Sequence, residues 1–374
     1  MSRAVKIGLV AVGLLVALAS VLYVRTMTRM GEFTTIMRTF KGESCLRVEG
    51  VAGPEDIAID CARGIAYVSA YDRRRVAEAG DRAGGVRGGI YVMDLNVPDD
   101  ELSLRPITPM TPDAFRPHGI SLFIGEDGRR TLMAVNHPGG GRHTVEIFDL
   151  AEDDTLSHRA TVEDGLIVSP NDVAAVSHEA FYVTNDHDRP DGRGRTLAAI
   201  LSSERGSVVY WDGVAARIVA DELAMANGVA LSRDAASVYV TELFARTLRI
   251  YARDEETGAL TLRDRVFLGT GVDNIDVAAD GSLWIGAHPK LATFAEHAAD
   301  PGTASPSQVV VVEPAQGGGG TAWTAYLDDG TEISGASVGA TYRDRLVIGA
   351  VFDPAVLVCR LGLEVGSDDL ARLR

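Results

Sequence analysis

Residues 54–60 read Pro-Glu-Asp-Ile-Ala-Ile-Asp, an acidic pair followed at once by a short apolar run. A short apolar or alternating run bounded by turn residues is typical of a β-strand. The same arrangement returns along the chain, each time with a polar stretch directly before a strand-like run. The later polar stretches are Pro117-His118-Gly119, Pro170-Asn171-Asp172, Ala226-Asn227-Gly228, Val272-Asp273-Asn274 and Ser334-Gly335.

Two further β-rich runs follow each of these first runs, so the chain divides into six units of roughly fifty to sixty residues. Units of this length that each hold several strands are the signature of β-propellers. The sequence therefore predicts an all-β fold, a six-bladed β-propeller. A ring built from one chain has to be closed, and we expect a strand around Cys45 to complete the last blade beside Val356–Cys359.

The N-terminal segment predicts a membrane anchor. Ile7–Val24 is an uninterrupted apolar run with basic residues on both sides, which is just long enough to span a bilayer. Ala17-Leu18-Ala19 resembles a signal-peptidase site, but the apolar run continues past it, which favours an uncleaved signal anchor. We predict an anchor over residues 1–30, a catalytic propeller over residues 31–374 on the non-cytoplasmic side (periplasmic or extracellular), and an amphipathic helix over Thr26–Arg38.

Charge and cysteine content narrow the possible partners. The formal net charge of −16 argues against nucleic acid, which requires a concentrated basic surface. No feature favours a particular oligomeric state. The three cysteines have no CxxC spacing, so a zinc or redox motif is excluded. In an exported chain, Cys45 and Cys359 would suit a disulfide that closes the ring, with Cys61 left free; three buried thiols are the alternative.

The polar stretches predict a metal site. In a propeller, every inner strand begins at the same end of the central channel. The polar residues at that position are Glu55, Asp56, His118, Asn171, Asp172, Asn227, Asp273 and Asn274. All except His118 offer oxygen atoms, and calcium takes six to eight oxygen ligands. Turn formation would explain any single stretch, but recurrence at one register in five units favours calcium.

Two histidines predict hydrolytic chemistry. His118 begins one predicted strand and His137 ends the next, so their side chains could touch. Such a pair can act as general base and proton relay for a water that attacks an ester carbonyl, while calcium polarises the carbonyl oxygen. The alternative is two structural, hydrogen-bonded histidines. His187 and His288 end the corresponding strands of other units and are predicted to be structural or pocket-wall residues.

These motifs resemble those of the paraoxonase/arylesterase family of calcium-dependent lactonases, from about Cys45 to Leu361. The motifs that carry the resemblance, in order, are PEDI (54–57), RPHGISLF (116–123), VNHP (135–138), PNDV (170–173), FYVTNDH (181–187), ANGVALS (226–232), VDNIDV (272–277), LWIGAHP (283–289) and DGTEISGASV (329–338). The uncleaved N-terminal hydrophobic segment also fits this family. Residues 72–89 and 188–206 depart from the vertebrate pattern, so we expect a different cover over the site.

The resemblance implies a propeller that holds two calcium ions in its channel. The implied ligands of a catalytic ion are Glu55, Asn171, Asn227, Asp273 and Asn274. Those of a structural ion are Asp56, Asp172 and the backbone carbonyl of Ile120. The resemblance also implies that His118 is the base and His137 its relay partner, that Cys45 and Cys359 form a disulfide, and that Phe352 and Met225 line the pocket.

The function predicted is a calcium-dependent hydrolase of lactones, with acyl-homoserine lactones among the candidate substrates. Aryl esters and phosphotriesters would be side substrates. The water would be activated by His118 with His137, or by a carboxylate such as Glu55 or Asp273. One alternative is a gluconolactonase-like sugar lactonase with a single metal. The other is a non-catalytic, calcium-stabilised propeller that binds a partner on one face. The partners predicted are a small lactone or ester substrate and a membrane.

Overall fold

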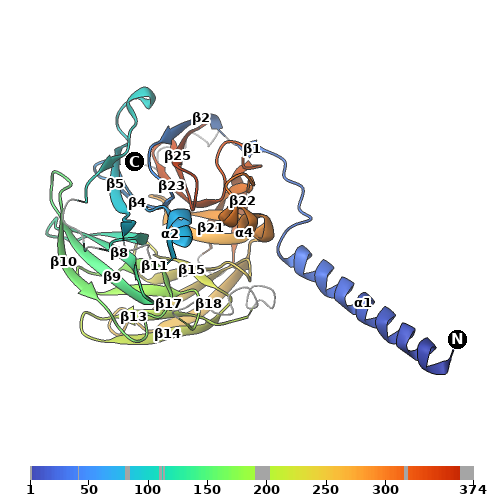
Figure 1. The fold of residues 1–374 in the computed structure, drawn as a ribbon. Coiled ribbons are helices and arrows are strands. Elements are labelled where there is room, and N and C mark those ends of the chain that lie inside the picture. Colours follow the sequence, from blue (N-terminus) through green and yellow to red (C-terminus); the bar gives the residue numbers. More distant parts are fainter. Residues whose placement is uncertain are drawn as a thin grey trace.

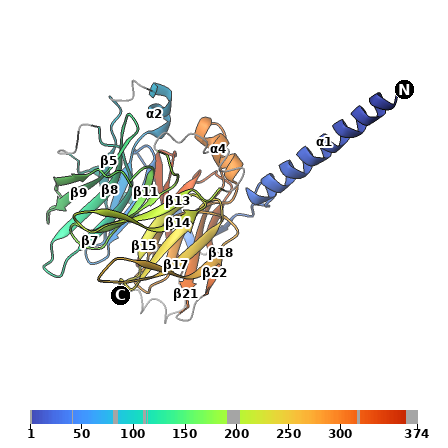
Figure 2. The same ribbon diagram turned by 90° about the horizontal axis from the view of Figure 1, so that it is seen from below.

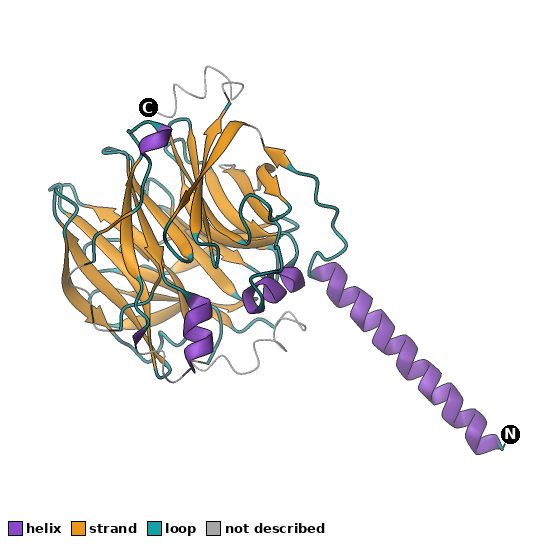
Figure 3. Cartoon of the chain, turned by 45° about the horizontal axis from the view of Figure 1, so that its top comes forward, coloured by secondary structure: helices purple, strands orange, loops and turns teal. Residues whose placement is uncertain are grey.

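The structure is a computed structural model, and it describes residues 2–40, 42–80, 85–108, 112, 114–189, 203–315 and 319–362. Antiparallel strands dominate it and form six sheets (Figures 1 and 3). The innermost strand of each sheet contacts the innermost strand of the next, from β3 through β7, β11, β15, β19 and β23 back to β3. This closed circuit of inner strands is a six-bladed propeller, and the predicted fold is confirmed.

The blades follow one another along the chain. Blade one contains β3 (Pro54–Asp60), β4 (Ile65–Ala70), β5 (Gly89–Asp94) and β6 (Arg105–Pro106). Blade two contains β7 (Pro117–Ile124), β8 (Arg130–Gly139), β9 (Arg142–Leu150) and β10 (Leu156–Val162). Blade three contains β11 (Pro170–Ala175), β12 (Phe181–Asn185), β13 (Gly206–Trp211) and β14 (Ala216–Leu223).

Blade four contains β15 (Ala226–Leu231), β16 (Ser237–Glu242), β17 (Thr247–Arg253) and β18 (Leu260–Phe267). Blade five contains β19 (Gly271–Val277), β20 (Leu283–His288), β21 (Ser307–Pro314) and β22 (Gly320–Asp328), and β1 (Thr39–Phe40) adds to its outer edge. Blade six contains β23 (Ala336–Tyr342), β24 (Arg345–Ala350), β25 (Ala355–Leu361) and β2 (Gly42–Glu49).

Blade six is closed by the N-terminal strand, as predicted. β2 pairs antiparallel with β25, and Cys45 lies directly opposite Cys359. The two cysteines form a disulfide across 314 residues of sequence. Cys61 is a free, exposed thiol. The ring is therefore fastened where its first and last strands meet.

The apolar N-terminal run forms one helix, α1 (Arg3–Arg29), with no buried residue. Among the described residues, α1 is the one helix long and apolar enough to cross a membrane. It projects away from the ring (Figures 1 and 2). The predicted helix over Thr26–Arg38 is wrong beyond Arg29, because the chain turns at Gly31, whose φ is +78°, and continues without helix to β1. An added Cβ at Gly31 would lie 2.0 Å from the Pro289 carbonyl oxygen, so this contact requires glycine.

Two short helices lie at one end of the ring, and one of them, α4, lies next to the point where α1 leaves it (Figures 1 and 2). They are α2 (Arg73–Ala79) and α4 (Leu291–Ala299). Arg74 of α2 donates a hydrogen bond to the backbone oxygen of His297 in α4, at 2.6 Å. The propeller domain was predicted to run to residue 374, but residues 363–374 lie outside the described part of the chain.

Candidate active site

The polar stretches meet at the end of the channel beneath α2 and α4. A cavity of about 440 Å³ opens there. Of the predicted site residues, it is lined by Glu55, His118, His137, Asn171, Asn227 and Asp273. Asn274 joins them from behind, since its Nδ2 donates to Glu55 Oε1 at 2.8 Å. The predicted catalytic set therefore comes together from five different blades.

Close packing between blades fixes the position of these stretches. The hydroxyls of Thr184, Thr241 and Ser337 donate to the backbone carbonyls of Asn227, Asp273 and Glu55 respectively, at 2.5–2.7 Å. Each of these hydrogen bonds joins one blade to the beginning of the innermost strand of the next blade. Gly119 is needed for the same reason, because a Cβ there would lie 2.2 Å from Asp172 Oδ1.

Glu55 is buried beside three groups that favour its ionised form. Its side chain is about 1% exposed. Burial opposes its ionisation, but His118, Arg73 and Asn274 together lower the pKa of its carboxyl to about 2. His118 Nε2 lies 3.4 Å from Oε1, and an Arg73 nitrogen lies 3.5 Å from Oε2.

Several buried oxygens in this wall lack a hydrogen-bond donor. Among the described residues, these oxygens are Glu55 Oε2 and the Oδ1 atoms of Asn171, Asn227 and Asn274. An unsatisfied buried acceptor costs roughly 1–3 kcal/mol, and a cation that contacts these four oxygens would remove that cost. Within the described ranges, no three His, Cys, Asp or Glu side chains are arranged to hold a metal by themselves. A bound ion would therefore depend on these amide oxygens, and a mixed carboxylate and amide set suits calcium.

Asp273 completes this wall and contacts a histidine. Burial raises the pKa of Asp273, although His288 Nε2, 2.8 Å from Oδ2, favours its ionised form. His288 in turn stacks on Phe294 of α4, with ring centroids 3.8 Å apart. His288 is thus a pocket-wall residue, whereas His187 is buried beside Asp188 and does not line the cavity.

Asp56, Asp172 and Ile120 lie deeper, around a second cavity of about 220 Å³. Asp56 accepts from the backbone N–H groups of Ile57 and Ile120, at 2.8 and 2.7 Å. Asp172 accepts in the same way from Val173 and Val229, both at 2.7 Å. Burial, with Glu55 nearby, raises the pKa of Asp56 well above its usual range, and burial with Asp56 nearby does the same for Asp172.

Those two aspartates thus tie neighbouring blades together, and the charge of Asp56 also opposes the ionisation of Asp172. A cation between them would relieve that repulsion. Asp56, Asp172 and Ile120 thus lie around a different cavity from Glu55, Asn171, Asn227 and Asp273.

Three histidines form a chain at the cavity wall. His118 Nδ1 lies 2.9 Å from His137 Nε2, and His137 Nδ1 lies 2.8 Å from His143 Nδ1. The predicted contact between His118 and His137 is therefore present. His143 was not among the predicted residues; it lies at the start of β9, which begins at Arg142. β8 and β9 pair at Asn136–Thr144 and at Gly139–Arg142, with a register shift between these two pairs, and His137 and His143 both lie in that stretch.

Two further residues of the wall also escaped prediction. Arg73, from the Arg-rich stretch that forms α2, lines the cavity next to Tyr71. Phe294 belongs to α4, a helix with no counterpart in the predicted repeat. The predicted wall residues Phe352 and Met225 do line the cavity. The altered stretch 188–206 cannot be compared, since residues 190–202 lie outside the described part.

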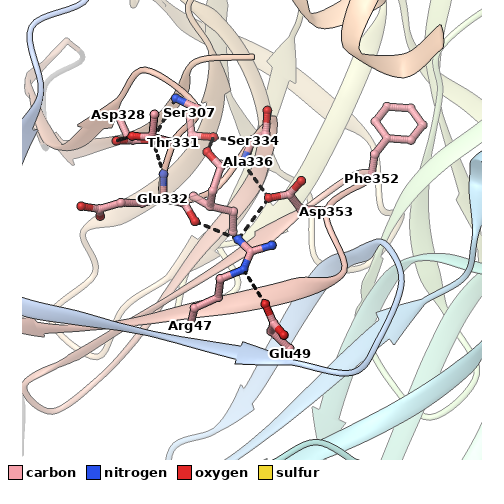
Figure 4. Close-up of polar contacts among 12 residues, drawn as sticks. Arg47, Glu49, Ser307, Asp328, Thr331, Glu332, Ser334, Ala336, Phe352 and Asp353 are labelled. Carbon is pink, nitrogen blue, oxygen red and sulfur yellow. Dashed lines mark hydrogen bonds and ion pairs between the residues drawn. The ribbon is translucent and has the colours of Figure 1, made fainter. Parts of the chain in front are cut away.

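Phe352 is held by a polar network on the blade-six side (Figure 4). Arg47 of β2 donates to the Glu332 carbonyl at 2.8 Å and to Asp353 Oδ2 at 3.2 Å. The Ser334 N–H donates to the same Asp353 oxygen at 3.0 Å. Figure 4 shows the Phe352 ring pointing away from this network. The closing strand therefore also steadies one wall of the cavity.

Comparison with known proteins gives consistent matches. A sequence model of the arylesterase family matches residues 65–361. The rat protein named serum paraoxonase/arylesterase 1 is 34% identical over 95% of this chain and 99% of its own length. The human protein of that name is 33% identical over 85% of this chain and 89% of its own. Among solved structures, an aldose sugar dehydrogenase from Streptomyces coelicolor aligns with a TM-score of 0.51 at 12% identity, over 87% of this chain and 99% of that one, which reflects the fold alone.

Proposed function

Since this chain belongs to the arylesterase family of ester-hydrolysing enzymes, we propose that it is a calcium-dependent lactonase with aryl esters and phosphotriesters as side substrates. The observation that carries the proposal is the group of buried, donor-less oxygens of Glu55, Asn171, Asn227 and Asn274 beside a histidine pair. Acyl-homoserine lactones are the substrates proposed for a bacterial source.

Two calcium ions per chain are proposed. Glu55, Asn171, Asn227, Asp273 and Asn274 would hold the first, and Asp56, Asp172 and the Ile120 carbonyl the second. An ion bound by the first set would supply positive charge against the ester carbonyl oxygen. Asn oxygens lack the charge of carboxylates, which leaves that positive charge incompletely neutralised and available to substrate.

The protein's own groups supply the proton transfers. His118 lines the cavity, and its Nε2 would take a proton from the attacking water, because its Nδ1 lies within hydrogen-bond distance of His137. Glu55, 3.4 Å from His118 Nε2, would stabilise the imidazolium that forms. His118 would then return a proton to the leaving alkoxide. The apolar side of the cavity, with Phe294 and Phe352, would hold the rest of the substrate and exclude water.

A panel of lactones and open-chain aryl esters, assayed with and without a calcium chelator, tests the proposal. We expect kcat/KM to be higher for lactones, to vanish on chelation and to return with calcium chloride. Asp273→Asn should lower it by roughly 10²-fold, the upper end of the effect of disturbing a metal's surroundings. A preference for open-chain aryl esters, or activity that survives chelation, would overturn it.

Two alternative functions can be distinguished from the proposed one by further measurements. One calcium per chain by metal analysis would favour a gluconolactonase-like sugar lactonase, whereas two support the present proposal. If His118→Gln, Glu55→Gln and Asp273→Asn all leave turnover intact, the site is misplaced. A chelation-sensitive fold without any turnover would indicate a binding propeller.

The location proposed is the non-cytoplasmic face of a membrane, with residues 1–30 as an uncleaved anchor and the propeller outside. The length of α1 and the Cys45–Cys359 disulfide support this, because disulfides persist in oxidising compartments. Membrane fractionation followed by protease treatment of intact cells tests it. A protein recovered in the soluble fraction, or protected from external protease, would contradict the proposal.

A further inference from the structure

The chain of imidazoles does not end at His137. His143 continues it, with its Nδ1 2.8 Å from His137 Nδ1 and ring centroids 5.0 Å apart at 85°. The first link has the same form, with centroids of His118 and His137 5.1 Å apart at 64°. All three rings line the cavity.

The hairpin between β8 and β9 places the third ring. Gly139, Gly140 and Gly141 all have positive φ, between 67° and 99°, which a run of other residues would rarely adopt. Two hydrogen bonds fix the Asn136 side chain: its Nδ2 donates to Glu146 Oε1 at 2.9 Å, and its Oδ1 accepts from the Arg116 backbone N–H at 2.9 Å. The backbone on both sides of His137 is therefore fixed against His143.

The tautomers of the three imidazoles fix the direction of the hydrogen bonds between them. A neutral imidazole carries one N–H and one free nitrogen. If His118 Nε2 is free to accept a proton, His118 Nδ1–H must donate to His137 Nε2. His137 Nδ1–H then donates to His143 Nδ1, and His143 carries its proton on Nε2. Each ring is thus prepared to accept at one nitrogen and donate at the other.

We propose that His143 is the outer member of a three-imidazole proton relay, which carries the proton of the attacking water away from His118. This inference rests on the proposed hydrolase function. His118 Nε2 gains the proton of water as the new bond from water oxygen to acyl carbon forms. His118 Nδ1–H passes its proton to His137 Nε2, and His137 Nδ1–H passes its proton to His143 Nδ1. His143 Nε2–H releases a proton to water or buffer, so each ring ends neutral and no oxidant or reductant is needed.

The reverse sequence returns one proton to the leaving alkoxide. His143 does not touch the reacting atoms in this scheme; it is a positioning residue that acts through His137. A purely structural role would instead be to hold the His137 ring at its angle. The two roles differ in one respect, since only a relay depends on the ability of residue 143 to exchange a proton.

The variant His143→Asn separates them, because the amide oxygen of asparagine can accept from His137 Nδ1–H near the position of the lost Nδ1 but cannot relay a proton. We expect kcat for a γ-lactone to fall by roughly tenfold or more, as a share of the 10²–10⁴-fold that general-base catalysis contributes, with KM unchanged. Added imidazole should restore part of kcat in this variant. The double variant His137→Gln/His143→Asn should have a kcat only slightly below that of His137→Gln alone, because both residues act on one proton path.

Arg142→Gln is the matched control on the same hairpin, since the Arg142 side chain is 60% exposed and pairs with Glu163 at the surface. Its kcat should equal that of the parent protein. Calcium binding and the unfolding midpoint of His143→Asn, measured alongside, should match the parent and show that the fold is intact. An unchanged kcat, or a loss that imidazole does not relieve and that adds fully to His137→Gln, would overturn the relay. Absence of hydrolysis in the parent protein would instead refute the proposed function.

Discussion

The Glu32 carboxylate, just beyond the apolar helix, accepts a 2.8 Å hydrogen bond from the Thr293 hydroxyl at the start of α4. Its other oxygen accepts the backbone N–H groups of Ala292 and Thr293, at 2.7 and 3.2 Å. The first N–H groups of a helix have no partner within the helix, so a residue from a distant segment acts here as its cap. The segment that joins α1 to the propeller is thereby fastened to a wall of the cavity.

Glu32→Ala should therefore loosen α4. We expect a loss of about 1 kcal/mol in the free energy of unfolding, the usual effect of removing a helix cap, and a rise in KM because Phe294 is less well held. Urea unfolding and steady-state kinetics measure the two effects. Glu43→Ala, at an exposed position of β2, is the control. Equal stability of both variants would show that the cap contributes nothing.

Glu55 and Asp56 are adjacent in sequence but should respond differently to loss of charge. Glu55 faces the larger cavity, so Glu55→Gln should abolish most activity and lower stability little. Asp56 uses both oxygens to accept backbone N–H groups. Asp56→Asn turns one acceptor into a donor facing an N–H, which should cost roughly 1–3 kcal/mol of stability. Parallel assays of turnover and thermal unfolding decide the matter, and an exchange of the two phenotypes would refute the assignment.

Removing the disulfide should destabilise the ring. The double variant Cys45→Ser/Cys359→Ser is expected to lose about 2–5 kcal/mol, because the cross-link restricts a long loop in the unfolded chain. Cys61→Ser serves as the control, since Cys61 is exposed and unpaired. Adding a reductant during urea unfolding should lower the stability of the parent protein and of Cys61→Ser by a similar amount and leave that of the double variant unchanged. If reductant leaves the parent's midpoint unchanged, the disulfide is not a source of stability.

His297 should make stability fall on acidification. Its ring lies between an Arg74 nitrogen, 3.1 Å from Nε2, and the Thr303 carbonyl, 2.6 Å from Nδ1. Burial, assisted by Arg74, lowers the pKa of His297. The unfolded chain therefore takes up the proton first, so this stability is complete above the unfolded pKa of about 6.5 and is lost as pH falls below it.

Urea unfolding at about pH 8 and about pH 5 measures this effect against the variant His297→Gln, which cannot titrate. The parent protein should lose more stability than the variant over that interval. The same loss in both proteins would show that His297 is not responsible.

The inner parts of the blades were predictable from sequence, whereas their outer edges were not. β8, the second strand from the axis of its blade, is buried along seven consecutive residues, which gives a clear apolar run. An outer strand such as β10 is buried only at Leu156 and Val162, and β18 has no buried residue. Strands of this kind are stabilised by pairing with their neighbour rather than by their own pattern, so they leave little trace in the sequence.

The site residues that occupy the same position in successive repeat units were predictable from the sequence. Glu55, Asn171, Asn227 and Asp273 share one register, and the repeat predicted that they meet. His143 and Arg73 lie outside the repeat, on a hairpin and a helix that belong to single blades. The cap by Glu32 depends on a contact across 261 residues, for which no local pattern exists.

The pairing of β2 with β25 has a consequence for how this protein is made. β2 is synthesised before any complete blade, whereas Cys359 of its partner β25 comes 314 residues after Cys45 of β2, so β2 stays unpaired until β25 has been synthesised. A message that stops before Ala355 would yield an open ring with two exposed strand edges, which invite aggregation. Quality-control proteases would then meet an incomplete ring as a target for degradation, and the cell would gain no partly active enzyme from it.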